Sequence, residues 1–234
     1  MSIITDEASS STLEAQWLNA VSPEDFIRNS STFNSLMMKY RCAIRQIETK
    51  LQVLNDEFSV TNKRNPISSI KSRVKSPSSI HGKLKRRGFP FTAESIVQNL
   101  DDVAGVRVVC PFISDIYAVA QLITSQDDIT VLKIKDYIKN PKENGYRSYH
   151  MIVEVPVYFS DGKEPMRAEI QIRTMGMDFW ASVDHQLHYK KELISGAEVS
   201  SIEQALCLCA ETVNETDRRM EAIKDLIGEF VVDM

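Results

Sequence analysis

The feature that most constrains the fold is the strict alternation of side chains at residues 166–174. Ala168, Ile170 and Ile172 would lie on one face of a β-strand here, because successive strand side chains point to opposite sides. The other face then carries only charged and amide side chains, namely Arg167, Glu169, Gln171 and Arg173. The pattern predicts a strand with one buried face and one polar face. The polar face either meets solvent or lines a polar cleft.

Three further segments are typical of strands. Residues 146–159 form a long segment that Asp161-Gly162 joins to 166–174 as a hairpin, and residues 129–135 form another. Residues 103–110 are continuously apolar except for Arg107, which favours a strand buried on both faces. Asn144-Gly145 predicts a turn before residue 146, since this dipeptide tolerates positive φ.

Helical spacing of apolar residues dominates the rest of the chain. It predicts helices over 32–57, 115–124, 176–192 and 199–228. Two shorter helices carry start signals: Ser76-Pro77 opens one that ends at Gly88, and Thr92 caps one over 92–99. Together these elements predict an α+β fold, with a mixed, largely antiparallel sheet of about five strands and flanking helices.

The 234 residues suit one catalytic domain with helical extensions, which we place at 61–192, with extensions at 1–60 and 193–234. A hydrophobic content of 43% allows a sizeable core, and a net charge of -4 argues against a general nucleic-acid coat protein. No apolar run is long enough for a membrane helix, and residues 1–11 lack the pattern of a signal peptide. We therefore expect a cytoplasmic protein, with its four cysteines reduced.

Residues 58–93 contain no Asp or Glu but nine Lys and Arg residues, although the whole chain is acidic. Arg73 and Lys75 precede the helix that begins at Ser76-Pro77, and Ser79 and Lys83 lie one turn apart on one face of it. A helix N-terminus with flanking cations favours anion binding. This segment is thus either a solvated or RNA-binding surface, or a set of groups that converge on a triphosphate.

Two carboxylates suggest a metal site. Asp102 stands directly before the apolar strand that contains Arg107, and Glu169 lies on the polar face of the 166–174 strand. Mg²⁺ in phosphoryl transfer is typically held by one or two carboxylates and substrate oxygens. The alternative is a structural ion pair of the Asp102–Arg107 type.

Residues 142–150 combine a turn with cations and an aromatic ring. Tyr146, Ser148 and His150 would share one strand face, with Lys142 nearby in the turn. Tyr146 could stack on a nucleobase while the cations hold phosphates. The alternative is an ordinary hairpin with an aromatic anchor.

These patterns alone are compatible with three functions. A single-stranded RNA-binding module would use the basic segment and Tyr146, but Asp102 and Glu169 would repel phosphate without a metal. An Mg²⁺-dependent nucleotidyltransferase would need such a pair of carboxylates and would release pyrophosphate. A structural protein built on the terminal helices is the third.

Five motifs appear in a single order along the chain: Arg73-x-Lys75-x3-Ser79-x3-Lys83, Asp102-x4-Arg107, Lys142-x-Asn144-Gly145-Tyr146-x-Ser148-x-His150, Glu169-Ile-Gln171-Ile-Arg173-Thr174 and Trp180-Ala181-x3-His185. This set resembles the synthetase domain of RelA/SpoT-type (p)ppGpp synthetases over about residues 65–190. The length is similar to that of the single-domain members, the small alarmone synthetases of the RelP and RelQ groups. The resemblance implies a nucleotidyltransferase-like synthetase fold.

The resemblance also implies an activity. It is the transfer of the β,γ-pyrophosphate of ATP to the ribose 3′-OH of GTP or GDP, which gives (p)ppGpp and AMP for stringent-response signalling. By the same resemblance, Mg²⁺ is the cofactor and a homotetramer is the expected assembly. RNA binding is possible but is not expected to be the primary role.

The resemblance assigns a role to each motif position. ATP would contact Arg73, Lys75, Ser79, Lys83 and Arg107. Asp102 and Glu169 would serve catalysis and Mg²⁺, with Glu169 able to take the proton of the attacking 3′-OH. GTP or GDP would contact Lys135, Lys142, Asn144, Tyr146, His150 and Gln171, with Tyr146 stacked on the guanine.

Overall fold

The computed structural model describes residues 30–61, 64–191 and 197–232. Residues 1–29, which include much of the expected N-terminal extension, lie outside the described part. Within it the helices are α3 (Ser31–Thr61), α4 (Pro77–Arg87), α5 (Ala93–Asn99), α6 (Ile113–Thr124), α7 (Met175–Lys191) and α8 (Ala197–Val232). The strands are β1 (Ser69–Val74), β2 (Ala104–Cys110), β3 (Thr130–Asp136), β4 (Tyr149–Phe159) and β5 (Gly162–Thr174).

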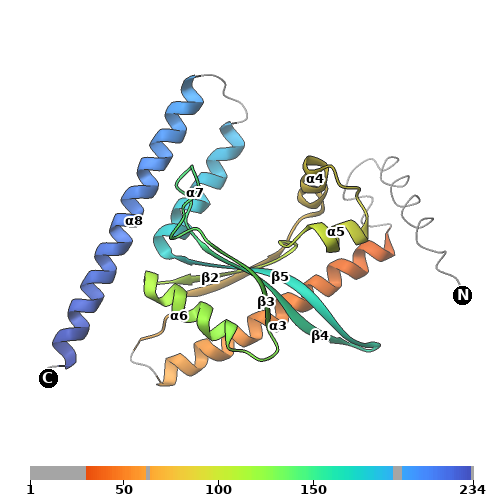
Figure 1. Cartoon of the computed structure of the whole chain (residues 1–234), viewed down its shortest axis with the longest axis horizontal. Helices are drawn as coiled ribbons and strands as arrows, with labels where there is room; N and C mark the ends of the chain where they lie inside the picture. Colours follow the sequence, from red (N-terminus) through yellow and green to blue (C-terminus); the bar gives the residue numbers. More distant parts are fainter. Residues whose placement is uncertain (1–29, 62–63, 192–196, 233–234) are drawn as a thin grey trace, which may run out of the picture. The chain divides into compact units, whose positions relative to one another are not determined.

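The five strands form one sheet in the order β1-β2-β5-β4-β3, which confirms the α+β fold with a mixed sheet (Figure 1). The side-chain alternation predicted for residues 166–174 is present on β5, the central strand of the sheet. Ala168, Ile170 and Ile172 are fully buried, whereas Arg167, Glu169 and Gln171 keep partial exposure. The polar face of β5 is therefore a real feature of the sheet.

Strand β1 was missed by the sequence reasoning. Its six residues, SIKSRV, are mostly polar and half-exposed to exposed, as suits an edge strand. The amide of Ser68 donates to the carbonyl of Val109, and that of Lys75 to the carbonyl of Val103, so β1 runs antiparallel to β2. The missed strand leads directly into Lys75 and the N-terminus of α4.

The predicted helix signals are confirmed in detail. Ser76 caps α4 by accepting from the amide of Ser79, with Pro77 as the first helical residue, and Gly88 ends the helix at φ 73°. Thr92 caps α5 by accepting from the amide of Ser95.

The boundaries of the long hairpin differ from the prediction. Strand β4 begins at Tyr149, so Tyr146 and Ser148 belong to the preceding loop and not to the strand expected over 146–159. Its partner β5 begins at Gly162, four residues before the expected Met166. The strand pairing continues down to the tight turn at residues 160–161. Lys163, Glu164 and Pro165 carry no apolar alternation, so the sequence pattern did not indicate that they belong to the strand.

The described residues divide into two compact units. The first holds residues 30–48, 72–106 and 154–169, and the second holds 49–61, 64–71, 107–153, 170–191 and 197–232. The three-part domain division at residues 60 and 192 stays a prediction.

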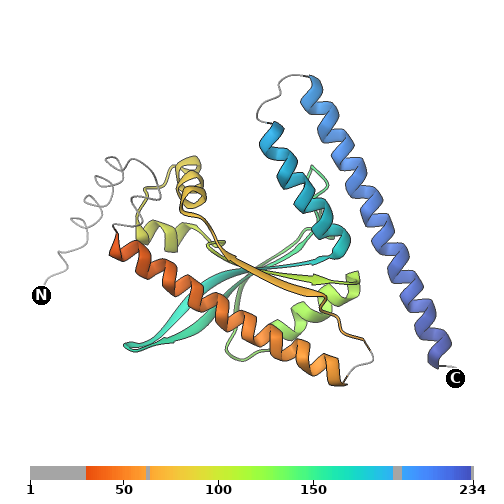
Figure 2. The ribbon, with the colours of Figure 1, turned by 180° about the vertical axis from the view of Figure 1, so that it is seen from behind.

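Helices α4 and α5 pack together in the first unit, with Ile80, Leu84 and Ile96 in its core. In the second unit α8 packs along α7 and reaches α6; Figures 1 and 2 show α7 and α8 side by side from opposite directions. No helix in the described ranges is both long and apolar enough to cross a bilayer.

Candidate active site

Three predicted site residues meet in the first unit. Lys75, at the end of β1, and Lys83, on α4, each donate from Nζ to Oδ2 of Asp102 at 2.8 Å. We call Lys75, Lys83 and Asp102 the aspartate cluster. All three side chains are only 17–23% exposed. The strand-to-helix connection at Ser76-Pro77 brings the two lysines to one carboxylate.

The electrostatics of Asp102 keep its carboxylate charged. Burial raises its pKa, but the hydrogen bonds and positive charges of Lys75 and Lys83 outweigh burial, so the pKa lies below its ordinary value. Its second oxygen, Oδ1, is buried and accepts no hydrogen bond from any residue that the structure describes. A charged carboxylate oxygen without a donor has the chemistry of a metal ligand.

The other predicted site residues of the first unit lie outside the aspartate cluster. Ser79 is exposed in the first turn of α4, where its hydroxyl accepts from that of Ser76 at 2.8 Å. Arg73 is exposed on β1. Glu169 lies on the polar face of β5, the neighbour of the strand that Asp102 precedes. Its partnership with Asp102 stays a prediction.

A second group of predicted residues meets in the second unit, at the start of β4 and the end of β5. The hydroxyl of Tyr146 lies 2.8 Å from Nε2 of His150 and accepts from Arg173 at 2.5 Å. Arg173 also donates to Oε1 of Gln171 at 2.8 Å. The Tyr146 hydroxyl therefore lies between the Arg173 guanidinium and the His150 ring, and both neighbours hold it in place.

Cations and a further ring complete this group. The ammonium of Lys142 lies 4.8 Å from the ring centre of Tyr146 and 5.0 Å from that of Tyr137. Tyr137 meets His150 edge-on at 5.2 Å and Tyr146 at 5.9 Å. The residues just described form what we call the aromatic cluster: Tyr137, Lys142, Tyr146, His150, Gln171 and Arg173.

Sequence reasoning missed the roles of Tyr137 and Arg173 within the aromatic cluster. Arg173 is 4% exposed, and burial lowers the pKa of its guanidinium, although the neighbouring Tyr146 and Asp178 favour its charge. A buried arginine needs partners, and its place on the polar face of β5 was the available signal. Tyr137 directly follows β3 and carried no such signal.

Arg107, another predicted site residue of the second unit, is linked to the aromatic cluster through Asp178. Arg107 pairs with Asp178 at 3.0 Å, and Asp178 also contacts Arg173 at 3.4 Å. Nε of Arg107 is buried and has no hydrogen-bond partner among the described residues. Arg107 and Arg73 belong to different units, so their joint contact with an adenine stays a prediction.

Asn144 and Lys135 complete the predicted set. Asn144 is exposed, and its side chain accepts from the amide of Tyr146 at 3.2 Å, which shapes the turn. Lys135 is half-buried near the end of β3.

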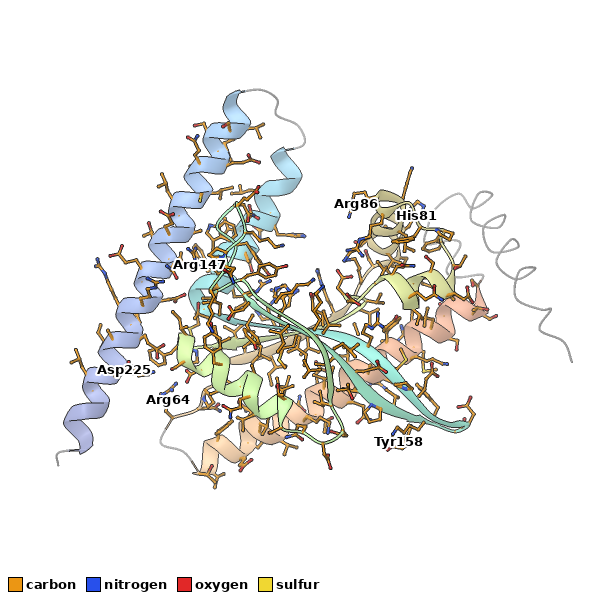
Figure 3. All side chains as sticks on the ribbon, in the orientation of Figure 1. Arg64, His81, Arg86, Arg147, Tyr158 and Asp225 are labelled. Carbon is orange, nitrogen blue, oxygen red and sulfur yellow. The ribbon has the colours of Figure 1, made fainter. Side chains whose placement is uncertain are left out.

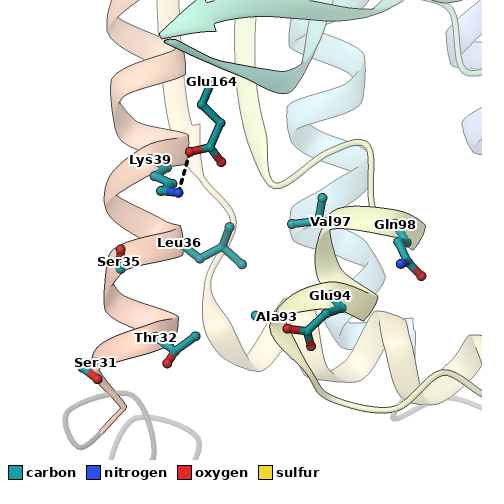
Figure 4. Close-up of a pocket in the computed structure, with 10 residues that line it drawn as sticks. All are labelled: Ser31, Thr32, Ser35, Leu36, Lys39, Ala93, Glu94, Val97, Gln98 and Glu164. Carbon is teal, nitrogen blue, oxygen red and sulfur yellow. Dashed lines mark hydrogen bonds and ion pairs between the residues drawn. The ribbon is translucent and has the colours of Figure 1, made fainter. Parts of the chain in front are cut away.

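A hollow of about 690 Å³ lies elsewhere in the first unit, between α3 and α5 (Figure 4). Its wall includes Leu36 and Val97, and the ion pair of Lys39 with Glu164 at 2.5 Å closes one side. None of the predicted site residues lines it. The hollow is therefore distinct from the aspartate cluster in the same unit.

Comparison with known proteins decides the family. A family model described as the region found in RelA / SpoT proteins matches residues 72–193, which is more than half of the chain. The chain belongs to the RelA/SpoT family. The matched region contains every residue of the aspartate cluster and of the aromatic cluster.

Two curated relatives within the RelA/SpoT family come from Bacillus subtilis (strain 168). GTP pyrophosphokinase YwaC is 40% identical over 188 residues, covering 80% of this chain and 88% of the relative. GTP pyrophosphokinase YjbM is 33% identical over 193 residues, covering 82% and 89%. The similarity therefore spans nearly the full length of both relatives.

Solved structures place the chain among the small alarmone synthetases of this family. Small alarmone synthetase 1 from Bacillus subtilis, bound to its product pppGpp, superimposes with a TM-score of 0.77 at 31% identity, covering 85% of this chain and 99% of that one. Small alarmone synthetase 2 from the same organism gives 0.73 at 39%, covering 82% and 98%. Another structure of synthetase 1 is bound to AMPCPP and gives 0.72 at 29%, covering 86% and 100%.

Proposed function

We propose that this small alarmone synthetase is a GTP pyrophosphokinase that moves the β,γ-pyrophosphate of ATP to the ribose 3′-OH of GTP or GDP. The products are (p)ppGpp and AMP. The observation that carries the proposal is Asp102, a charged carboxylate held by two lysines on one oxygen and unpartnered on the other. Family membership supplies the reaction. The two clusters would supply residues for its two nucleotides.

On the ATP side, Lys75 and Lys83 would donate to phosphate oxygens. Both ammonium groups already bind a carboxylate oxygen, and a phosphate oxygen offers the same acceptor chemistry with more charge. Ser79 in the first turn of α4 adds a hydroxyl and a helix N-terminus. Arg73 and Arg107 would flank the adenine.

Mg²⁺ fits the residues present. Oδ1 of Asp102 is a buried, charged and unpartnered oxygen, which is the ligand type that Mg²⁺ prefers. Asp102 and Glu169 would hold the ion together with phosphate oxygens, and bound Mg²⁺ would neutralise charge on the transferred group. Glu169 would also accept the proton of the attacking 3′-hydroxyl.

On the acceptor side, Tyr146 would stack on guanine. Its hydroxyl is fixed by Arg173 and His150, so the ring is held in place before the nucleotide arrives. Lys142, beside the ring, would meet the acceptor phosphates, while Lys135, Asn144, His150 and Gln171 would complete the contacts. Positioning and charge neutralisation are what phosphoryl transfer requires of a protein.

We also propose a cytoplasmic homo-oligomer, with a tetramer as the expected size. Met220, Ile223 and Ile227 lie three to seven residues apart on α8 and are 50–58% exposed, which supports a helix face that another copy covers.

Product analysis tests the function. Purified protein is mixed with ATP, GTP and Mg²⁺, with and without EDTA, and the nucleotides are separated by ion exchange. We expect AMP to appear in step with a more highly phosphorylated guanosine nucleotide, and to vanish with EDTA. Release of pyrophosphate without AMP would instead identify a nucleotidyltransferase.

A further inference from the structure

Helix α8 contacts the loop that carries Tyr146, and it does so through closely packed small residues. We call residues 142–147 the acceptor loop. Gly145 has φ 84°, and a Cβ added to it would lie 2.6 Å from Cβ of Ala210, so the loop backbone lies directly against α8. The sulfur of Cys207, one turn earlier, lies 3.9 Å from the carbonyl of Glu143. Any larger side chain at this contact would displace the loop.

Arg147 ties the acceptor loop to α8 by hydrogen bonds. Its Nη1 donates to the carbonyl of Gly145 at 3.1 Å and to the carbonyl of Ala210 at 3.3 Å. Figure 3 shows Arg147 beside α8. Because one guanidinium nitrogen donates to both carbonyls, it holds the loop backbone next to Tyr146 against α8.

The same helix also holds the end of β5. The hydroxyl of Thr174, the last residue of β5, donates to Oδ2 of Asp217 at 2.5 Å and accepts from the amide of Met177 at 3.0 Å. A Cβ on Gly176 would lie 2.8 Å from Val213 and 2.9 Å from Asp217. Helix α8 therefore contacts both segments that supply the aromatic cluster, the acceptor loop and the β5 end with Gln171 and Arg173.

We propose that α8 is a positioning element for the acceptor nucleotide, acting through the contact of Ala210 and Arg147 with the acceptor loop. This inference rests on the proposed function of the aromatic cluster. A change at this contact alters the position of Tyr146 and Lys142, and so weakens binding of the guanosine nucleotide. Lys75 and Lys83, proposed for the ATP phosphates, belong to the other unit, and Arg107, proposed for the adenine, shares the second unit but is not part of this contact. We therefore expect ATP affinity to change far less than GTP affinity.

Two variants test the contact from opposite sides. Arg147→Met keeps the aliphatic stem and removes the donors, and Ala210→Leu enlarges the α8 side without changing charge. Arg219→Met is the matched control, because Arg219 lies on α8 but is 75% exposed and pairs only within the helix, with Glu215. Thermal unfolding establishes the temperature at which all four proteins are folded.

The readouts are KM for GTP, KM for ATP, kcat, and direct calorimetric binding of GTP without ATP. We expect KM for GTP and its dissociation constant to rise roughly 5- to 30-fold in Arg147→Met, as the loss of its two hydrogen bonds predicts. Both constants should also rise in Ala210→Leu, because the larger side chain displaces the loop. KM for ATP should stay within about twofold, and the Arg219 control should match wild type.

The outcomes distinguish failure of the α8 inference from failure of the proposed function. If the variants bind GTP as wild type does, or lose GTP and ATP affinity equally, α8 has no specific positioning role and the inference is overturned. If the wild-type protein binds neither GTP nor GDP, the proposed function itself fails, and the inference fails with it.

Discussion

Replacing Asp102 by asparagine removes one negative charge from the aspartate cluster while keeping the shape of the side chain. The account predicts opposite effects on two properties. Transfer should fall by at least about a hundredfold, because a neutral amide is a poor Mg²⁺ ligand and the loss of one key electrostatic group typically costs that much. Binding of ATP without metal should become tighter, because the carboxylate no longer competes for Lys75 and Lys83.

The size of the second effect follows from the geometry. Each lysine nitrogen lies 2.8 Å from Oδ2 of Asp102. A phosphate oxygen bound on the far side of an ammonium would therefore lie about 6 Å from the carboxylate. Two like unit charges at about 6 Å repel each other by about 0.7–2.8 kcal/mol, for effective dielectric constants of about 80 to 20. The predicted gain in metal-free ATP affinity is thus about threefold or more.

Calorimetric titration of ATP in EDTA, together with turnover in saturating Mg²⁺, measures both effects. The control is Asp101→Asn, which changes the adjacent aspartate, a 43% exposed residue paired with Arg167 at 3.0 Å. It should leave both properties near wild type. Weaker metal-free ATP binding in Asp102→Asn, or turnover close to wild type, would refute the reasoning.

Three further predictions concern single groups. Tyr146→Leu should raise KM for GTP by a factor that corresponds to about 1–3 kcal/mol of lost stacking, with little change in KM for ATP. Tyr158→Leu is the control, because Tyr158 is 72% exposed at the hairpin (Figure 3), and it should change neither KM in the same assay. Lys83→Met should weaken ATP binding about tenfold or more, whereas Lys85→Met, two residues along the same helix and exposed, should bind ATP as wild type does. The pKa of Asp102 in the folded protein lies below its ordinary value of 3.8. The stability that the ionised carboxylate contributes is therefore present above pH 3.8 and is lost as the pH falls through the folded pKa. The difference in urea unfolding free energy between wild type and Asp102→Asn should accordingly shrink below about pH 3.8.

Local signals were enough to predict most elements. The caps at Ser76, Thr92 and Gly88 depend on neighbours three or four residues away, so sequence spacing captures them. The alternation on β5 likewise needs only the strand period. The edge strand β1 was missed because an exposed strand needs no apolar face, and its pairing with β2 joins residues 68–75 to residues 103–109.

The same distinction between local patterns and long-range contacts applies to the candidate site. Lys75, Lys83 and Asp102 could be proposed from motif spacing, but the sharing of a single oxygen by two lysines depends on tertiary packing. The contacts of Tyr137 and of Arg147 join segments that no local pattern connects, and the contact of Arg147 reaches 63 residues along the chain to α8. Residues of this kind become visible only once the chain is folded.

The central claim is that two phosphates move together from ATP to a ribose 3′-hydroxyl. The most direct test uses ATP labelled at the β-phosphorus, with either GTP or 3′-deoxy-GTP as acceptor, and follows the label by chromatography. The account predicts that label moves onto GTP, that unlabelled AMP remains, and that 3′-deoxy-GTP receives nothing. Label retained on the adenosine nucleotide, or equal transfer to the 3′-deoxy acceptor, would contradict it.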